Sequence, residues 1–214
     1  MLNNIKEFFF IHYKLFKLLF RAVNKGFLHD IGWINSYKTK TPVNIKNQPI
    51  PWLTYSFISY IENRLNKSMN IFEYGSGNST LYFAEKVKDV ISVEHDKKWF
   101  EIFLEKIPKN VQLKHCDLQY RGDYCKTIFS TESKYSIIII DGRDRVNCIL
   151  NSTSSLSKDG VLILDDSERE EYQNGITHLK QLGYKELDFW GIAPGIFYNK
   201  CTSIFYRDHN CLGI

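Results

Sequence analysis

The chain has 214 residues, a length that fits one globular domain with a small appendage. Its hydrophobic content of 43% excludes intrinsic disorder and fibrous repeats, and no apolar run approaches the roughly 18 residues of a membrane-spanning helix. The net charge of +4 comes from the first 50 residues, which carry eight Lys or Arg residues against two acids, so the nearly neutral remainder does not predict a nucleic-acid partner.

Five cysteines stand at positions 116, 125, 148, 201 and 211. Their odd number and the lack of any CxxC pair argue against a disulfide scaffold or a zinc ribbon. Unpaired thiols are typical of proteins that work in a reducing compartment. We therefore expect a cytoplasmic protein.

Residues 5–25 contain no Gly or Pro and predict a single amphipathic helix. At about 100° per residue, Lys14, Lys17 and Arg21 fall in one arc, while Phe, Leu and Ile residues take most of the remaining circumference. Such a helix either packs against protein, on its own domain or on a second subunit, or lies at a membrane surface. The sequence thus leaves open a homo-oligomer and a peripheral membrane contact through residues 5–25.

Residues 26–52 hold three prolines, two glycines and no clear periodicity, which predicts an irregular strap leading into the body. The expected organisation is therefore an N-terminal helix and strap over residues 1–52, followed by a domain over residues 53–214. The large aromatic residues Trp33, Trp52 and Tyr55 pack either over a ligand pocket or into the core.

Helical and strand patterns alternate from residue 53 onward. The expected helices cover residues 53–65, 79–88, 97–106, 145–156 and about 169–182. The expected strands cover residues 70–74, 90–93, 111–115, 137–140, 161–164, 184–190 and 201–206. The all-apolar run at 137–140 is typical of a central parallel strand, and the last two strands follow each other without a helix. This order predicts an α/β, doubly wound, mostly parallel seven-stranded sheet with an antiparallel edge strand.

Polar side chains follow each of the first five strands, at the sheet edge where ligands bind in open parallel sheets. The first strand leads to Glu73, Gly75, Ser76, Gly77, Ser79 and Thr80. The later strands lead to Glu94, His95, Asp117, Asp141, Asp165 and Asp166. Solvated surface chemistry does not explain a carboxylate at every strand end, so we interpret this set as a ligand site.

The spacing of these residues distinguishes between cofactors. A dinucleotide fingerprint, GxGxxG, would place a third glycine where this chain has Thr80. Glu73 would repel a pyrophosphate, whereas a cofactor with a positively charged amino group accounts for this acid. Glu94 lies 19 residues beyond Gly75, the usual separation for an acid that binds ribose hydroxyls.

The segments FEYGSGNST, SVEHD, KHCDLQ and IIIIDGRDR resemble the strand-end motifs of class I S-adenosylmethionine-dependent methyltransferases. The resemblance covers roughly residues 70–206 and implies that S-adenosyl-L-methionine is the cofactor. It further implies that Glu73, Gly75 and Gly77 hold the methionine part of the cofactor. By the same resemblance, Glu94 would bind the ribose and Asp117 the adenine edge.

Asp141, Asp165 and Asp166 end adjacent predicted strands, where their oxygen atoms suit Mg²⁺. This arrangement is similar to that of metal-dependent O-methyltransferases of the catechol and macrolide-sugar types, which implies that Mg²⁺ would acidify a substrate hydroxyl. The catechol type carries a lysine base three positions after its first acid, whereas this chain has Asp144 there. That departure argues against a catechol and makes Asp141 and Asp144 the candidate catalytic residues.

Structural roles remain open for several of these residues. Asp166 and Ser167 could cap the following helix, and Asp141 could serve the cofactor alone. Arg143 and Arg145 either clamp an anionic group of the substrate or extend into solvent.

The sequence therefore predicts a methyltransferase that modifies a hydroxyl of a small molecule, such as a sugar, a phenol or an amphipathic compound. An aminopropyl transferase of the same fold is one alternative, and it would need an acidic pocket for an amine. A non-catalytic scaffold docked through the N-terminal helix is another. No acceptor follows from the sequence.

Overall fold

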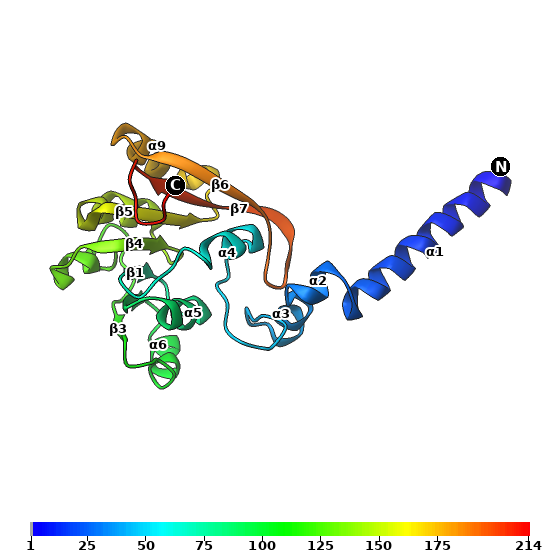
Figure 1. The fold of residues 1–214 in the computed structure, drawn as a ribbon, viewed down its shortest axis with the longest axis horizontal. Coiled ribbons are helices and arrows are strands. Elements are labelled where there is room, and N and C mark those ends of the chain that lie inside the picture. Colours follow the sequence, from blue (N-terminus) through cyan, green and yellow to red (C-terminus); the bar gives the residue numbers. More distant parts are fainter. Residues whose placement is uncertain (1) are drawn as a thin grey trace.

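The computed structural model describes the backbone of residues 2–214 and the side chains from residue 10 onward, apart from those of residues 19, 22 and 23. Within this part of the chain, seven strands form one sheet in the order β3-β2-β1-β4-β5-β7-β6 (Figure 1). The strands are β1 (Asn70–Tyr74), β2 (Asp89–Glu94), β3 (Val111–His115), β4 (Tyr135–Ile140), β5 (Leu156–Asp165), β6 (Lys185–Ala193) and β7 (Ile196–Tyr206).

Strands β1 to β5 pair in parallel, and β7 runs antiparallel between β5 and the edge strand β6. The predicted doubly wound α/β sheet is confirmed. The chain order reverses between β1 and β4, and ligands of open α/β sheets bind at such a switch point.

The helices of the body are α4 (Tyr55–Ile61), α5 (Asn78–Lys86), α6 (Lys97–Leu104), α7 (Asp123–Lys126), α8 (Arg145–Ser152) and α9 (Gln173–Gln181). The five predicted helices are all shorter than the sequence predicts, and α4 covers only residues 55–61 of the predicted 53–65. Helix α8 ends at Ser152 because a 3₁₀ turn over residues 153–155 leads into β5, and α9 begins only after a second 3₁₀ turn over residues 170–172. Ser167 therefore does not cap α9, and its hydroxyl instead bonds to that of Ser203 at 2.6 Å.

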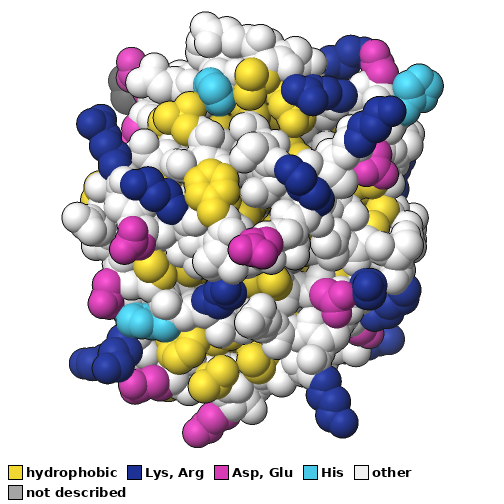
Figure 2. Space-filling view, turned by 90° about the vertical axis from the view of Figure 1, so that its left-hand side faces the viewer, with side chains coloured by type: hydrophobic (Ala, Val, Ile, Leu, Met, Phe, Trp, Pro, Cys, Tyr) yellow, Lys and Arg dark blue, Asp and Glu magenta, His cyan; other side chains and the backbone are white. Residues whose placement is uncertain are grey.

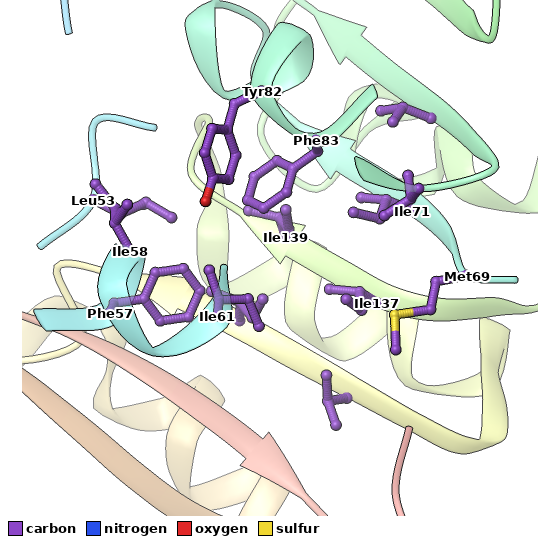
Figure 3. Packing of buried hydrophobic residues seen from close by; sticks show 14 of the residues in the cluster. Leu53, Phe57, Ile58, Ile61, Met69, Ile71, Tyr82, Phe83, Ile137 and Ile139 are labelled. Carbon is purple, nitrogen blue, oxygen red and sulfur yellow. The ribbon is translucent and has the colours of Figure 1, made fainter. Parts of the chain in front are cut away.

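Strand β4 shows why the sheet is buried on both faces. Its isoleucines at 137–140 alternate sides and are all fully buried. Ile137 and Ile139 pack with side chains of α4 and α5 (Figure 3), whereas Ile138 and Ile140 pack with those of α7, α8 and α9. Both faces of the strand are therefore covered, which leaves only its ends free for a ligand.

The strap of residues 26–52 is more regular than expected. It contains two short helices, α2 (Phe27–Asp30) and α3 (Trp33–Thr39), separated by Gly32. Gly32 has a φ of 80°, and a Cβ there would lie 2.5 Å from the carbonyl carbon of Asn44, so the bend depends on glycine. Two indole nitrogens fasten the strap to the tip of the β6–β7 hairpin. Trp33 Nε1 donates to the carbonyl of Ile196 at 2.9 Å, and Trp52 Nε1 donates to that of Pro194 at 2.8 Å.

Helix α1 (Leu2–Asn24) confirms the predicted N-terminal helix and extends away from the sheet (Figure 1). None of the helices in the described part of the chain combines the length and apolar character that crossing a membrane requires.

Candidate active site

A cavity of about 740 Å³ opens at the carboxyl ends of β1, β2, β4 and β5. One part of its wall comes from the turn after β1 and the end of β2, namely Gly75, Ser76, Ser79, Glu94 and His95. The other part comes from the ends of β4, β5 and β7 and from the strap, and includes Trp52, Asp141, Arg143, Asp144, Arg145, Asp165, Asp166, Tyr198 and Lys200. One cavity therefore joins Gly75, Ser76, Ser79, Glu94 and His95 to the predicted catalytic residues, whereas Glu73, Gly77, Thr80 and Asp117 lie outside its lining.

The floor of the cavity depends on a close approach of two glycines. Gly75 follows β1 with a φ of 98°, and a Cβ at this position would lie 3.2 Å from the Cα of Gly142, which follows β4. A Cβ on Gly142 would lie only 2.1 Å from Tyr124 Oη. The backbones after β1 and β4 therefore meet without side chains between them, which keeps this part of the sheet edge open.

Glu73 lies beneath the glycine turn and is almost fully buried. Its Oε2 accepts hydrogen bonds from the hydroxyls of Thr80 at 2.5 Å and Ser92 at 3.2 Å. Its Oε1 is buried and has no hydrogen-bond partner in the described part of the chain. Burial raises the pKa of the carboxyl to about 7. The unpaired Oε1 could accept a hydrogen bond from a cationic group at the turn.

Glu94 connects the two strand ends on the cofactor side. Its Oε2 accepts hydrogen bonds from the backbone N–H of Ser76 at 3.2 Å and from the Ser76 hydroxyl at 2.9 Å. Its Oε1 accepts from the backbone N–H groups of His95 and Asp96 at 2.8 and 2.9 Å. The carboxylate therefore orders the β1 turn against the end of β2 while it lines the cavity.

The acceptor side of the cavity contains a buried lysine that the sequence pattern does not predict. Lys200, on β7, places its Nζ 2.5 Å from Asp165 Oδ2 and 2.7 Å from Asp166 Oδ1. Burial acts to lower the pKa of Lys200, but the charges of the two aspartates raise it above its ordinary value. Lys200 is therefore a permanent cation between these two acids.

Arg145 completes the charge cluster, which we define as Asp141, Arg145, Asp165, Asp166 and Lys200. Its Nη2 lies 3.1 Å from Asp141 Oδ1, and its Nη1 lies 3.4 Å from Asp166 Oδ2. Burial, followed by the nearby charge of Asp165, raises the pKa of Asp141 well above its ordinary value. Asp141 lines the cavity, and its raised pKa makes it a candidate to accept a proton there.

The predicted magnesium site does not fit this geometry. Asp141, Asp165 and Asp166 lie close together, as expected, but two cationic side chains, Lys200 and Arg145, pair with them. No group of three or more His, Cys, Asp or Glu side chains in the described residues could hold a metal ion. The expectation of Mg²⁺ is corrected, because an ammonium and a guanidinium already supply the positive charge that these carboxylates need.

Three predicted residues either have structural hydrogen-bond partners or lie outside the cavity lining. Asp144 lines the cavity, but its carboxylate already accepts hydrogen bonds from the backbone N–H of Arg121 at 2.7 Å and from Asn147 Nδ2 at 2.6 Å. Gly77 caps α5, and its N–H donates to the buried Thr80 hydroxyl at 3.1 Å. The side chain of Asp117 is 93% exposed and does not line the cavity.

Of the aromatic residues that the sequence places over a pocket or in the core, Trp52 lines the cavity, whereas Trp33 and Tyr55 do not. Tyr198 also lines the cavity. The sequence does not indicate a role for Lys200, because a single lysine between Asn199 and Cys201 is typical of an exposed hairpin residue. Only the pairing of β7 with β5 in the structure reveals its place, since Lys200 stands two residues from the partner of Asp165 in the register.

Comparison with known proteins supports the fold and not a closer relationship. No protein-family model and no curated protein matches this chain. Among solved structures, a putative O-methyltransferase from Klebsiella pneumoniae is similar at a TM-score of 0.54 and 15% identity, covering 89% of this chain and 94% of that one. A precorrin-6y C5,15-methyltransferase from Geobacter metallireducens has a TM-score of 0.54 at 10% identity, covering 71% and 88%. A putative methyltransferase from Streptococcus mutans, solved in complex with SAH, has a TM-score of 0.51 at 12% identity, covering 70% and 94%. The chain therefore has the fold of class I methyltransferases.

Proposed function

We propose that this protein binds S-adenosyl-L-methionine and transfers its methyl group to an oxygen atom of a small-molecule acceptor. The observation that carries the proposal is the single cavity that joins the glycine turn and Glu94 to Asp141 and the charge cluster. The solved neighbours share this fold, and one of them holds the demethylated cofactor, which supports the cofactor assignment.

The residues of the cofactor side fit this ligand. Glu73 Oε1 is a buried, unpaired carboxylate oxygen, and a positively charged amino group would satisfy it. Glu94 already holds the turn that would surround the amino-acid part, and its carboxylate lines the cavity, where it would accept hydrogen bonds from ribose hydroxyls. The bound cofactor would supply an electrophilic methyl group, and the protein would supply alignment and a base.

Asp141 is the residue we assign to proton removal. Burial, followed by the charge of Asp165, raises the pKa of Asp141, which makes its carboxylate a stronger base than an exposed aspartate. Arg145 donates to Asp141 and keeps its carboxylate oriented on the cavity wall. Lys200 stays protonated and neutralises Asp165 and Asp166, which leaves Asp141 as the base.

The acceptor side favours a hydroxyl over an amine. An aminopropyl transferase would need free acids to bind a polyamine, whereas Asp165 and Asp166 are each paired with Lys200, and Asp166 also contacts Arg169 at 2.7 Å. The exposed Arg143 and the aromatic side chains of Trp52 and Tyr198 line the same wall, which supports an acceptor with an aromatic or apolar body.

The proposal is tested by incubating the full chain with methyl-labelled S-adenosyl-L-methionine and a panel of phenols, sugars and amphipathic alcohols. We expect a labelled ether product, no need for added Mg²⁺, and loss of product in Asp141→Asn, with binding of S-adenosylhomocysteine retained. Label on nitrogen, or full product formation by Asp141→Asn, would contradict the assignment.

A further inference from the structure

Helix α1 carries large apolar side chains that nothing in the described chain covers. Phe16 and Phe20 are 68% and 65% exposed, and Ile11 is 56% exposed. Burying one such side chain contributes about 1.5–3 kcal/mol, so it is unfavourable to leave several of them exposed to water. The helix extends away from the sheet in Figure 1, and its apolar face does not serve the core.

The same helix presents a basic stripe. Lys14, Lys17, Arg21 and Lys25 are all exposed, and no acid occurs between Glu7 and Asp30. The face of the body turned to the viewer in Figure 2 differs, because basic and acidic side chains are interspersed there and the hydrophobic side chains form only small groups. The positive charge is therefore concentrated on the one element that also exposes a continuous apolar face.

The charge and the apolar surface of α1 indicate which kind of partner fits it. Its charged stripe excludes a position across a bilayer, in agreement with the lack of a membrane-spanning helix among the described residues. A second copy could cover the apolar face, but its own α1 has no acid between Glu7 and Asp30 to pair with the basic stripe. An anionic bilayer surface offers both an apolar layer and negative headgroups.

We propose that α1 lies flat on an anionic membrane surface, with Phe16 and Phe20 inserted among the acyl chains and Lys14, Lys17 and Arg21 at the headgroups. The helix has 23 residues and is about 35 Å long, enough for several such contacts along one face. This inference does not depend on the proposed reaction, and neither result decides the other.

The test is sedimentation of the full chain with vesicles of phosphatidylcholine alone or mixed with anionic phosphatidylglycerol. We expect binding to the mixed vesicles only, decreasing as salt is added, because screening weakens the headgroup attraction. The triple variant Lys14→Gln, Lys17→Gln, Arg21→Gln should bind about 100-fold more weakly, since each basic residue contributes about 1 kcal/mol. The double variant Phe16→Ser, Phe20→Ser should lose binding to a similar degree.

Matched control variants on the body show whether vesicle binding depends on α1 or only on total charge and exposed apolar area. Lys106→Gln, Lys109→Gln, Lys158→Gln removes the same charge from exposed positions, and Phe129→Ser, Leu150→Ser removes exposed apolar side chains. Both should bind the mixed vesicles as the unmodified chain does. Equal binding to neutral and anionic vesicles, retention by the α1 variants, no vesicle binding at all, or a dimer that the α1 variants abolish would each overturn the proposal.

Discussion

If Glu73 holds the amino group of the cofactor as we propose, this one buried carboxyl makes cofactor binding depend on pH. Its pKa is raised to about 7 by burial, so it is largely neutral below that value and ionised above it. An ionised Glu73 attracts the amino group of the cofactor, and a neutral one does not. We predict that the affinity for S-adenosylhomocysteine falls up to about tenfold per pH unit below pH 7.

Calorimetric titration between about pH 6 and pH 8 checks this dependence. Glu73→Gln should bind weakly and with little change over the range, since the amide does not titrate. The same pH dependence in the variant as in the unmodified chain would show that another group is responsible.

Lys200 is the residue on which the charge cluster depends most. Lys200→Met would leave Asp165 and Asp166 buried without their main cation, and breaking a buried pair costs about 3–5 kcal/mol. Burial raises the pKa of Asp165 in the folded protein. When the pKa of a carboxyl is higher in the folded than in the unfolded state, the fold becomes less stable as pH rises from the unfolded to the folded value. We therefore predict a large loss of unfolding free energy at alkaline pH and a smaller loss at acidic pH.

Urea unfolding at both pH values measures the effect, with the exposed Lys158→Met as the control. A Lys200→Met variant as stable as the control would mean that the cluster does not need its lysine.

Among the elements, the turns after β1 and β4 make the most specific demand on sequence. A Cβ on Gly142 would lie 2.1 Å from Tyr124 Oη, whereas a Cβ on Gly77 would meet no atom within 4 Å. Gly142→Ala should therefore destabilise the fold by about 2 kcal/mol or more, and Gly77→Ala should change it by less than about 0.5 kcal/mol. Chemical denaturation of both variants gives the comparison, and equal stabilities would contradict the close packing of Gly142 against Tyr124.

The sheet was predictable because the strand signals are local. Residues 137–140 are apolar on both faces, and the strands at 70–74 and 111–115 were predicted with the bounds they have. The two helices of the strap were not predicted, since their short sequences lack a clear period and depend on Trp33 and Trp52 bonding to the distant β6–β7 hairpin. The start of β5 at Leu156 likewise depends on pairing with Tyr135, a contact that the local pattern does not contain.

The candidate site was predictable in its location and not in its charge balance. Residues that follow strands lie at one edge by the logic of the fold, so Gly75, Glu94 and Asp141 could be grouped from the sequence. The partners of the acids could not, because Lys200 reaches the site from the antiparallel strand β7. That missing contact is the reason a metal site was expected where a lysine pairs with the aspartates.

At the scale of the whole molecule, three parts of the chain converge on one cavity. The sheet edge contributes the acids, the strap contributes Trp52, and the β6–β7 hairpin contributes Tyr198. Helix α1 leads directly into this strap, so a membrane-bound α1 would hold the cavity near the lipid surface. An amphipathic hydroxyl compound is the acceptor that this arrangement favours.

The central claim is that the cavity at the sheet edge binds S-adenosyl-L-methionine, and calorimetric titration of the full chain with S-adenosylhomocysteine tests it most directly. We predict saturable binding at one site per chain, retained in the exposed control Glu101→Gln and weakened at least about tenfold in Glu94→Gln, a loss of about 1.4 kcal/mol. No saturable binding, or binding by Glu94→Gln equal to that of the control, would contradict the claim.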